Sequence, residues 1–170
     1  MPSILPTRKL GKNGPQVPAL GFGLMGLSIA YGKVESDEAR FKILDRAFEL
    51  GETFWDSSDL YGDNEELVGK WLANNPDKRK DIFLATKFAF VHAGDKPGPM
   101  IDSSPEYLKD ACEKSLKRLG VDTIDLYYCH RVDGKTPIEL TVQAMAELKK
   151  SAPFQSLGEI CTNIVQRGKS

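Results

Sequence analysis

The sequence has no excess of charge of either sign. Its 170 residues include 23 lysine and arginine residues against 24 aspartate and glutamate residues, which gives a formal net charge of −1. Surfaces that bind nucleic acid or anionic membranes usually carry a basic excess, so this balance argues against both. We therefore expect no nucleic-acid partner and no membrane partner.

Cysteine is also scarce, and long hydrophobic runs are missing. The three cysteines, Cys112, Cys129 and Cys161, are odd in number and widely spaced, which argues against a disulfide framework and against a zinc site. No hydrophobic run approaches the roughly 18 residues of a membrane span, and the N-terminus does not resemble a signal peptide. These absences predict free thiols, no bound metal and a cytoplasmic location.

What the sequence does contain is an alternation of short apolar runs and helical patterns. Hydrophobic residues make up 41% and charged residues 28%, as in a globular chain, and the length suits one domain. Four buried strands are predicted, at Val17–Phe22, Thr53–Trp55, Ile82–Phe88 and Ile124–Cys129. This alternation predicts an α/β protein whose parallel strands are neighbours in sequential order.

The helices between these strands have recognisable ends. Four are predicted, from about Ser36 to Leu50, from about Asp63 to Asn75, from Ser104 to Gly120, and from Thr136 onward. Ser104 before Pro105 is an N-cap pattern, and a glycine such as Gly120 ends a helix. Ile43 and Leu140 are among the apolar positions that we expect to face the core.

Two segments lie outside this alternation. Thr7–Pro18 is rich in turn residues and is predicted to form a small hairpin. Val91–Asp102 is rich in glycine and proline and is predicted to form a long loop after the third strand, where long loops tend to be functional.

Four polar side chains fall where the predicted strands end. Asp56 follows the second strand, Lys87 lies near the end of the third, and His130 closes the fourth. Tyr61 follows Asp56 by five residues. Because the carboxyl ends of parallel strands meet at one rim, where such proteins bind ligands, we expect the four side chains to cluster there.

Each of these residues also has a purely structural interpretation. Asp56 could cap a turn, Tyr61 could be an amphipathic rim residue, and a lone histidine such as His130 is more often structural than catalytic. Lys87 is harder to explain in this way, because it lies in an apolar strand where a buried charge must be paired. His92, in the glycine- and proline-rich loop, is the competing histidine.

Residues 21–26 match the pattern G-x-G-x-x-G of dinucleotide-binding folds. In those folds the glycines open directly into a helix, whereas about ten residues separate Gly26 from the helix expected at Ser36. We therefore interpret the glycines as the end of the first strand, where a neighbouring group approaches the backbone closely, and not as a Rossmann turn.

Four motifs in order resemble those of the aldo-keto reductase family, and the resemblance covers roughly residues 7–150. The motifs are Leu10–Gly14 with Val17–Gly23, Trp55–Gly62, Ala85–Phe88 and Asp125–His130. The helix segment Glu113–Gly120 is similar as well. The resemblance implies a partial (β/α)8 TIM barrel of about four to five βα units with an N-terminal β-hairpin over 7–150. Residues 151–170 form a divergent tail with a possible fifth strand at Phe154–Leu157.

The resemblance also implies an activity, which is the NADPH-dependent reduction of a small aldehyde or ketone to an alcohol. The implied catalytic residues are Asp56, Tyr61, Lys87 and His130. Tyr61 would donate the proton, Lys87 would stabilise negative charge on its oxygen, Asp56 would hold Lys87 charged, and His130 would orient the substrate oxygen. The implied cofactor-binding residues are Gly23, Leu24, Met25 and Asp56.

The chain is short for this fold, because a (β/α)8 barrel typically needs about 250 residues. By resemblance, the segments that hold the adenosine phosphates would lie beyond its length, so we expect weak NADPH binding. An alternative is a catalytically weak or inactive half barrel that acts through protein–protein association. In that case we expect self-association through the open barrel edge, because unpaired strand edges invite pairing.

Overall fold

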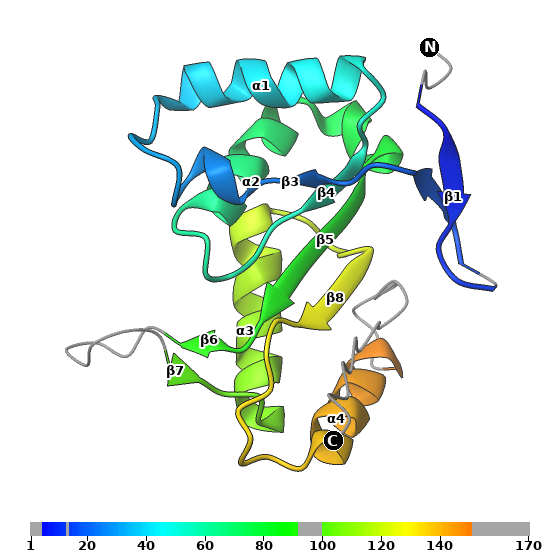
Figure 1. Cartoon of the computed structure of the whole chain (residues 1–170), viewed down its shortest axis with the longest axis vertical. Coiled ribbons are helices and arrows are strands. Elements are labelled where there is room, and N and C mark those ends of the chain that lie inside the picture. Colours follow the sequence, from blue (N-terminus) through cyan, green and yellow to red (C-terminus); the bar gives the residue numbers. More distant parts are fainter. Residues whose placement is uncertain (1–4, 13, 92–99, 151–170) are drawn as a thin grey trace, which may run out of the picture.

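The computed structural model describes residues 5–12, 14–91 and 100–150. The tail 151–170, its possible fifth strand, His92 and Cys161 lie outside the described residues. The centre of the fold is a four-stranded sheet with the order β3-β4-β5-β8, in which every neighbouring pair is parallel (Figure 1). The strands span Phe22–Gly23, Phe54–Asp56, Phe83–Phe88 and Leu126–Cys129. The predicted sequential parallel order is therefore confirmed.

In the part of the chain that the structure describes, four α-helices alternate with these strands, as predicted. They are α1 (Asp37–Glu49), α2 (Asn64–Asn74), α3 (Pro105–Leu119) and α4 (Ile138–Lys150), and 3₁₀ turns lie at η1 (Met25–Leu27) and η2 (Pro76–Asp81). The hydroxyl of Ser104 accepts the Tyr107 amide at 3.2 Å, and Gly120 ends α3 with a left-handed φ of 62°. Within the described ranges, no helix has the length and apolar character needed to cross a membrane.

The first predicted strand, Val17–Phe22, is wrong as a single element. Its first part belongs to β2 (Gln16–Pro18), which pairs antiparallel with β1 (Thr7–Lys9) in the expected hairpin. Pro18 has no amide hydrogen to donate to a neighbouring strand. The amide of Ala19 donates to the Pro6 carbonyl at 2.8 Å, so this residue still belongs to the hairpin and not to the parallel sheet. The sheet strand β3 therefore begins only at Phe22.

The predicted loop Val91–Asp102 begins and ends in ordered structure. Short strands β6 (Phe90–Val91) and β7 (Met100–Ile101) pair antiparallel at its two ends. Ala89, with a φ of 109°, turns the chain from β5 into this pair. Figure 1 shows the pair projecting from the end of the sheet at which β5 and β8 finish.

The hydrophobic core lies between the sheet and the helices. Trp55, Leu84 and Tyr127 point to the helical side from adjacent strands, and all three are almost completely buried. In Figure 1, α3 runs behind β5 on this side. Ile43 and Leu140 were expected in the core but are 46% and 47% exposed, because each lies on the outer side of its helix, while Leu44 and Met145 are buried.

The opposite side of the sheet corresponds to a barrel interior. Phe54 and Phe83 are paired in register, and their rings meet edge to face at 5.1 Å between centroids. Asp56, Ala85 and Leu126 follow in the next paired row. This side therefore carries apolar rings at its amino-terminal end and polar groups toward its carboxyl-terminal end.

The helices α2 and α3 approach each other most closely at Gly69. A Cβ atom at this position would lie 2.3 Å from the Arg118 carbonyl oxygen and 3.0 Å from the Leu119 carbonyl carbon. Both contacts are to backbone, which cannot move aside as a flexible side chain would. The absence of a side chain at Gly69 therefore permits this helix packing.

We expect Gly69→Ala to lower the free energy of unfolding by about 1–3 kcal/mol, because the added methyl group overpacks the helix interface. In an unobstructed helix the same change would stabilise by up to about 1 kcal/mol. Denaturant unfolding followed by the fluorescence of Trp55 and Trp71 measures the difference. Gly23→Ala is the control, since its Cβ would meet no atom within 4 Å. Equal stability of Gly69→Ala and wild type would contradict the packing argument.

Candidate active site at the carboxyl ends of the strands

A buried lysine connects the predicted site residues. Lys87 is 5% exposed, and its Nζ donates to Asp56 Oδ2 at 2.6 Å, to the Ser57 carbonyl at 2.7 Å and to the Tyr61 hydroxyl at 3.1 Å. The three hydrogens of the ammonium thus have three acceptors. The predicted proximity of Lys87 to both Asp56 and Tyr61 is confirmed.

Asp56 is held from both sides. Its second oxygen, Oδ1, accepts the Tyr128 hydroxyl at 2.6 Å. Burial, followed by this hydrogen bond, raises the pKa of Tyr128 above its ordinary value, so Tyr128 remains a donor. The sequence analysis did not select Tyr128 as a site residue. The available signal was its position one residue before the end of a predicted strand, which is also the position of Lys87, and the structure places the two side by side.

His130 completes the cluster through ring contacts. Its imidazole meets the Tyr61 ring at 5.8 Å between centroids and the Phe90 ring at 4.8 Å, both edge to face. Burial, followed by the charge of Lys87, lowers the pKa of His130 to about 4, so the ring is neutral near pH 7. All four predicted residues therefore lie together at one rim.

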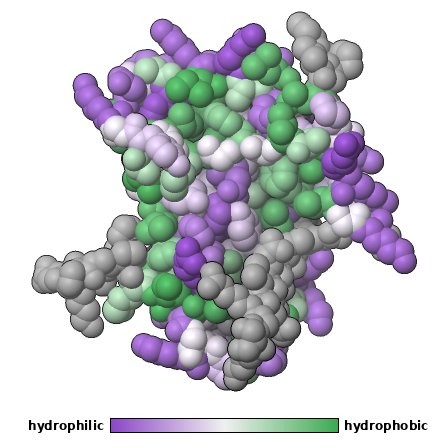
Figure 2. All heavy atoms as spheres, in the orientation of Figure 1, coloured by the Kyte–Doolittle hydropathy of each residue, from purple (hydrophilic) through white to green (hydrophobic). Residues whose placement is uncertain are grey.

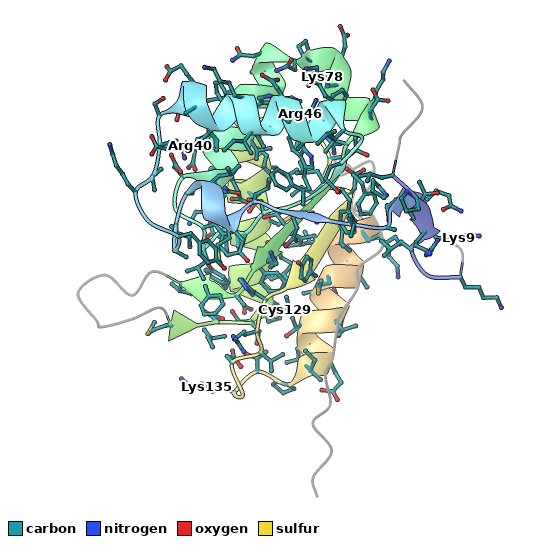
Figure 3. The ribbon with its side chains drawn as sticks, turned by 45° about the horizontal axis from the view of Figure 1, so that its top comes forward. Lys9, Arg40, Arg46, Lys78, Cys129 and Lys135 are labelled. Carbon is teal, nitrogen blue, oxygen red and sulfur yellow. The ribbon has the colours of Figure 1, made fainter. Side chains whose placement is uncertain are left out.

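The local backbone explains why these side chains meet. Asp56 is the last residue of β4, and Lys87 is the penultimate residue of β5. His130 directly follows β8, where its amide donates to the Phe88 carbonyl at 2.8 Å. Figure 3 labels the preceding residue, Cys129, and so marks this end of β8. Tyr61 lies in the loop before α2, and its amide donates to the Ser58 carbonyl at 3.2 Å.

The glycine run of residues 21–26 forms the end of β3 and leads into η1. Gly23 pairs with Asp56, and a Cβ at Gly23 would meet no atom within 4 Å, so its backbone borders open space beside the carboxylate. Leu24 is fully buried; its amide donates to Asp56 O and its carbonyl accepts from Asn64 Nδ2, each at 2.9 Å. Since α1 begins only at Asp37, the run is not a Rossmann turn.

A buried arginine fixes the turn that follows β3. Arg40 is 4% exposed, and its two Nη atoms contact the two carboxylate oxygens of Asp63 at 2.8 Å each. Arg40 Nη1 also donates to Leu27 O and to Ser28 Oγ, each at 3.3 Å. The Arg40 hydrogen bond lowers the pKa of Asp63 to about 2. Sequence periodicity gave no indication of this contact.

A second carboxylate, Asp59, is linked to His130 through the hydroxyl of Ser58. Its Oδ1 is 3.2 Å from Ser58 Oγ, and its Oδ2 is 3.2 Å from the Tyr107 hydroxyl. Burial, followed by the negative charge of Glu65, raises the pKa of Asp59 to about 6. Ser58 Oγ is also 3.2 Å from His130 Nδ1. The sequence analysis did not single out either residue.

Comparison with known proteins identifies relatives that are all aldo-keto reductases. The model of the aldo/keto reductase family matches residues 19–158. Aldo-keto reductase str7 of Strobilurus tenacellus is 54% identical over 91% of the chain and 45% of the relative. Aldo-keto reductase yakc [NADP(+)] of Schizosaccharomyces pombe is 44% identical over 96% of the chain and 48% of the relative. The chain thus spans about half the length of these curated relatives.

Solved structures agree with the sequence relatives. The holo form of aldo-keto reductase AKR11C1 from Bacillus halodurans has a TM-score of 0.74 at 38% identity. The match covers 86% of this chain and 47% of that one. The four-stranded parallel sheet therefore corresponds to about half of a known barrel.

The opposed pKa shifts of Asp59 and His130 predict how stability depends on pH. Asp59 has a pKa of about 6 against an ordinary 3.8, so its contribution to stability decreases as pH rises from 4 to 6. His130 has a pKa of about 4 against an ordinary 6.5, so its contribution is present above pH 6.5 and is lost as pH falls to 4. We expect Asp59→Asn to lose stability more steeply than wild type as pH falls from 6.5 to 4.

Denaturant unfolding at half-unit pH steps measures these slopes. The exposed Asp122, changed to asparagine, serves as the control and should keep the wild-type slope. Asp63, whose pKa of about 2 lies below its ordinary 3.8, contributes the same slope near pH 4 to wild type and to Asp59→Asn, so it cancels in the comparison. Parallel pH profiles for wild type and Asp59→Asn would contradict the raised pKa of Asp59.

Proposed function

The chain belongs to the aldo/keto reductase family, and on this premise we propose that its site reduces an aldehyde or ketone to the alcohol with NADPH as cofactor. The observation that carries the proposal is the contact of the buried Lys87 ammonium with both Asp56 and the Tyr61 hydroxyl. This arrangement places a proton donor beside a fixed positive charge at a ligand-binding rim.

The residues at the rim fit a nicotinamide cofactor. Gly23 offers backbone that borders open space directly beside Asp56, and a side chain there would fill this space. Leu24 has no exposed atom, so among the residues that the resemblance implies, contact falls to Gly23, Met25 and Asp56. When bound, the cofactor would supply a hydride to the carbonyl carbon of the substrate.

In the proposed reaction, Tyr61 donates the proton. Negative charge develops on the substrate oxygen as the carbonyl is reduced, and the Tyr61 hydroxyl hydrogen neutralises it. The oxygen of Tyr61 then becomes anionic, and Lys87 Nζ, 3.1 Å away, stabilises that charge. Asp56 balances the buried ammonium, and Tyr128 keeps Asp56 in place.

His130 orients the substrate in this proposal. Its ring is neutral near pH 7 and lies edge to face with Tyr61, so it neighbours the proton donor. Its Nδ1 is occupied by Ser58. The other ring nitrogen, Nε2, is therefore left for the substrate oxygen, to which it donates a hydrogen bond when it carries the imidazole proton.

We expect Tyr61→Phe to lower the rate of carbonyl reduction by about 10²- to 10⁴-fold, because the general acid is removed. The dissociation constant for NADPH should stay unchanged. The assay is the loss of NADPH absorbance with an aldehyde, and NADPH fluorescence measures binding. Tyr31→Phe is the matched control, since Tyr31 is 79% exposed. Unchanged turnover in Tyr61→Phe would remove Tyr61 from the acid role.

A second proposed function is self-association, which the exposed edges of the sheet favour. In the described part of the chain, the edge strands β3 and β8 each pair with one neighbour only. Two copies would supply eight parallel strands, the number in a closed (β/α)8 barrel. Pairing β3 of each copy with β8 of the other would satisfy both edges of both sheets.

An apolar groove lies along the β3 edge, between this strand and α1. It has a volume of about 590 Å³ and is lined by residues that include Leu5, Leu20, Phe22, Ile43 and Leu50. Leu20 is 61% exposed and Ile43 is 46% exposed. Figure 2 shows hydrophobic surface (green) in the upper part of the view, where α1 lies. A second copy could therefore bury hydrophobic side chains in this groove, although Lys42, Arg46 and Glu52 also line it.

We expect the wild-type chain to dimerise at micromolar concentration, and Ile43→Glu to shift it toward monomer by placing a charge in the groove. Light scattering coupled to size exclusion measures the mass at several concentrations. Val34→Glu is the control, because Val34 is similarly exposed at 43% but does not line the groove. A wild-type monomer at all concentrations would contradict the association.

A further inference from the structure

The hydroxyl of Ser58 lies between two groups that compete for its hydrogen. Ser58 is 1% exposed, and its Oγ is 3.2 Å from both Asp59 Oδ1 and His130 Nδ1. The amide of Leu60 already donates to this oxygen at 3.2 Å. A hydroxyl has one hydrogen to donate, so Ser58 can satisfy either the carboxylate or the imidazole as a donor, but not both.

The acceptor that receives the Ser58 hydrogen determines which nitrogen of His130 carries the imidazole proton. When Ser58 donates to Nδ1, the imidazole proton must lie on Nε2, which then donates to a substrate oxygen. When Ser58 donates to Asp59, Nδ1 carries the proton and donates to Ser58, and Nε2 presents a lone pair. A carbonyl oxygen accepts a hydrogen bond from the first form and is repelled by the second.

We propose that Ser58 and Asp59 are positioning residues that set the tautomer of His130. The carboxylate form of Asp59 holds the Ser58 hydrogen and favours the Nδ1–H imidazole. The carboxylic acid form releases that hydrogen and favours the Nε2–H imidazole that a carbonyl substrate requires. The consequence for substrate rests on the proposed function, whereas the tautomer itself is a property of the chain alone.

The surroundings of Asp59 favour its acid form at mildly acidic pH. The Tyr107 hydroxyl is 2.8 Å from the Phe90 carbonyl and 3.2 Å from Asp59 Oδ2, and its one hydrogen can be donated to only one of them at a time, so the carboxylate competes with the carbonyl for this donor. Burial, followed by the charge of Glu65 on α2, raises the pKa of Asp59 to about 6, while the hydrogen bonds from Ser58 and Tyr107 and the charge of Arg118 on α3 oppose the rise.

The other charged or titratable groups near Asp59 are engaged elsewhere or neutral. Arg118 pairs with Glu65, Nε to Oε2 at 2.7 Å, and the Lys87 ammonium pairs with Asp56. On β8, burial raises the pKa of Cys129 to about 11 and that of Tyr127 well above its ordinary value, so both are neutral. His130 has a pKa of about 4 and is neutral above pH 5. Between pH 5 and 7.5, the titration of Asp59 therefore controls this cluster.

Nitrogen-15 NMR of the imidazoles tests the proposal on the full chain without cofactor or substrate. The sequence has two histidines, so His92→Gln assigns the His130 signals. In wild type we expect the ratio of Nε2–H to Nδ1–H to rise several-fold as pH falls from 7.5 to 5. Asp59→Asn and Ser58→Ala should each abolish the pH response of this ratio, because the first removes the titrating carboxyl group and the second removes the shared hydroxyl.

Ser57→Ala is the matched control, because the Ser57 hydroxyl contacts Asn64 and not His130. It should keep the wild-type response. Backbone amide spectra confirm that each variant is folded. A wild-type ratio that stays constant from pH 5 to 7.5 would overturn the proposal without reference to any variant. The same response in Ser58→Ala and wild type would also overturn it.

The predicted effect of the His130 tautomer on catalysis is measured separately, by enzyme kinetics. Where the wild type reduces a carbonyl, Ser58→Ala should lower kcat/KM for that substrate several-fold and leave the NADPH dissociation constant unchanged. An altered tautomer with unaltered kcat/KM would overturn the link to the substrate. If the wild type reduces no carbonyl, the proposed function fails while the NMR result still decides the tautomer, so the two failures are distinguishable.

Discussion

The burial of the Lys87 ammonium is the constraint around which the site is arranged. A buried charge is costly unless it is paired and fully hydrogen-bonded. Lys87 meets this condition with one carboxylate, one carbonyl and one phenol oxygen, all supplied by residues 56–61. The segment after β4 must therefore keep a fixed path, since displacement of Asp56 or Tyr61 would leave a buried donor unsatisfied.

The parallel register makes this pairing possible across three strands. Asp56, Ala85 and Leu126 form one row on the interior side of the sheet, while Lys87 and Tyr128 form the next. Asp56, at the end of β4, reaches both Lys87 and Tyr128. It can do so because its neighbour in the first row, Ala85 on β5, has only a small side chain. Tyr128 thus acts on Lys87 in two ways: its hydroxyl holds the carboxylate that pairs with Lys87, and its ring centroid lies 5.4 Å from Lys87 Nζ as a cation–π partner.

The parts of the fold that local chemistry decides were predictable from the sequence. The N-cap Ser104 and the left-handed Gly120 fixed the third helix to within a residue, and the rule for carboxyl ends of parallel strands brought Lys87 and His130 together. Contacts between distant residues were not predictable. Arg40 with Asp63 and Asp59 with Tyr107 join separate elements, and no periodicity in a single sequence specifies such a pairing.

The site divides between central and edge strands, and this division has a consequence for its stability. Asp56 and Lys87 lie on β4 and β5, each hydrogen-bonded to neighbours on both sides. Gly23 and His130 lie at β3 and at the end of β8, the two edges within the described sheet. Local opening starts where backbone hydrogen bonds are exposed and few apolar contacts cross. The Lys87–Asp56 pair, on the two central strands, is therefore the most persistent part of the site, whereas Gly23 and His130, at the edges of the described sheet, open most readily.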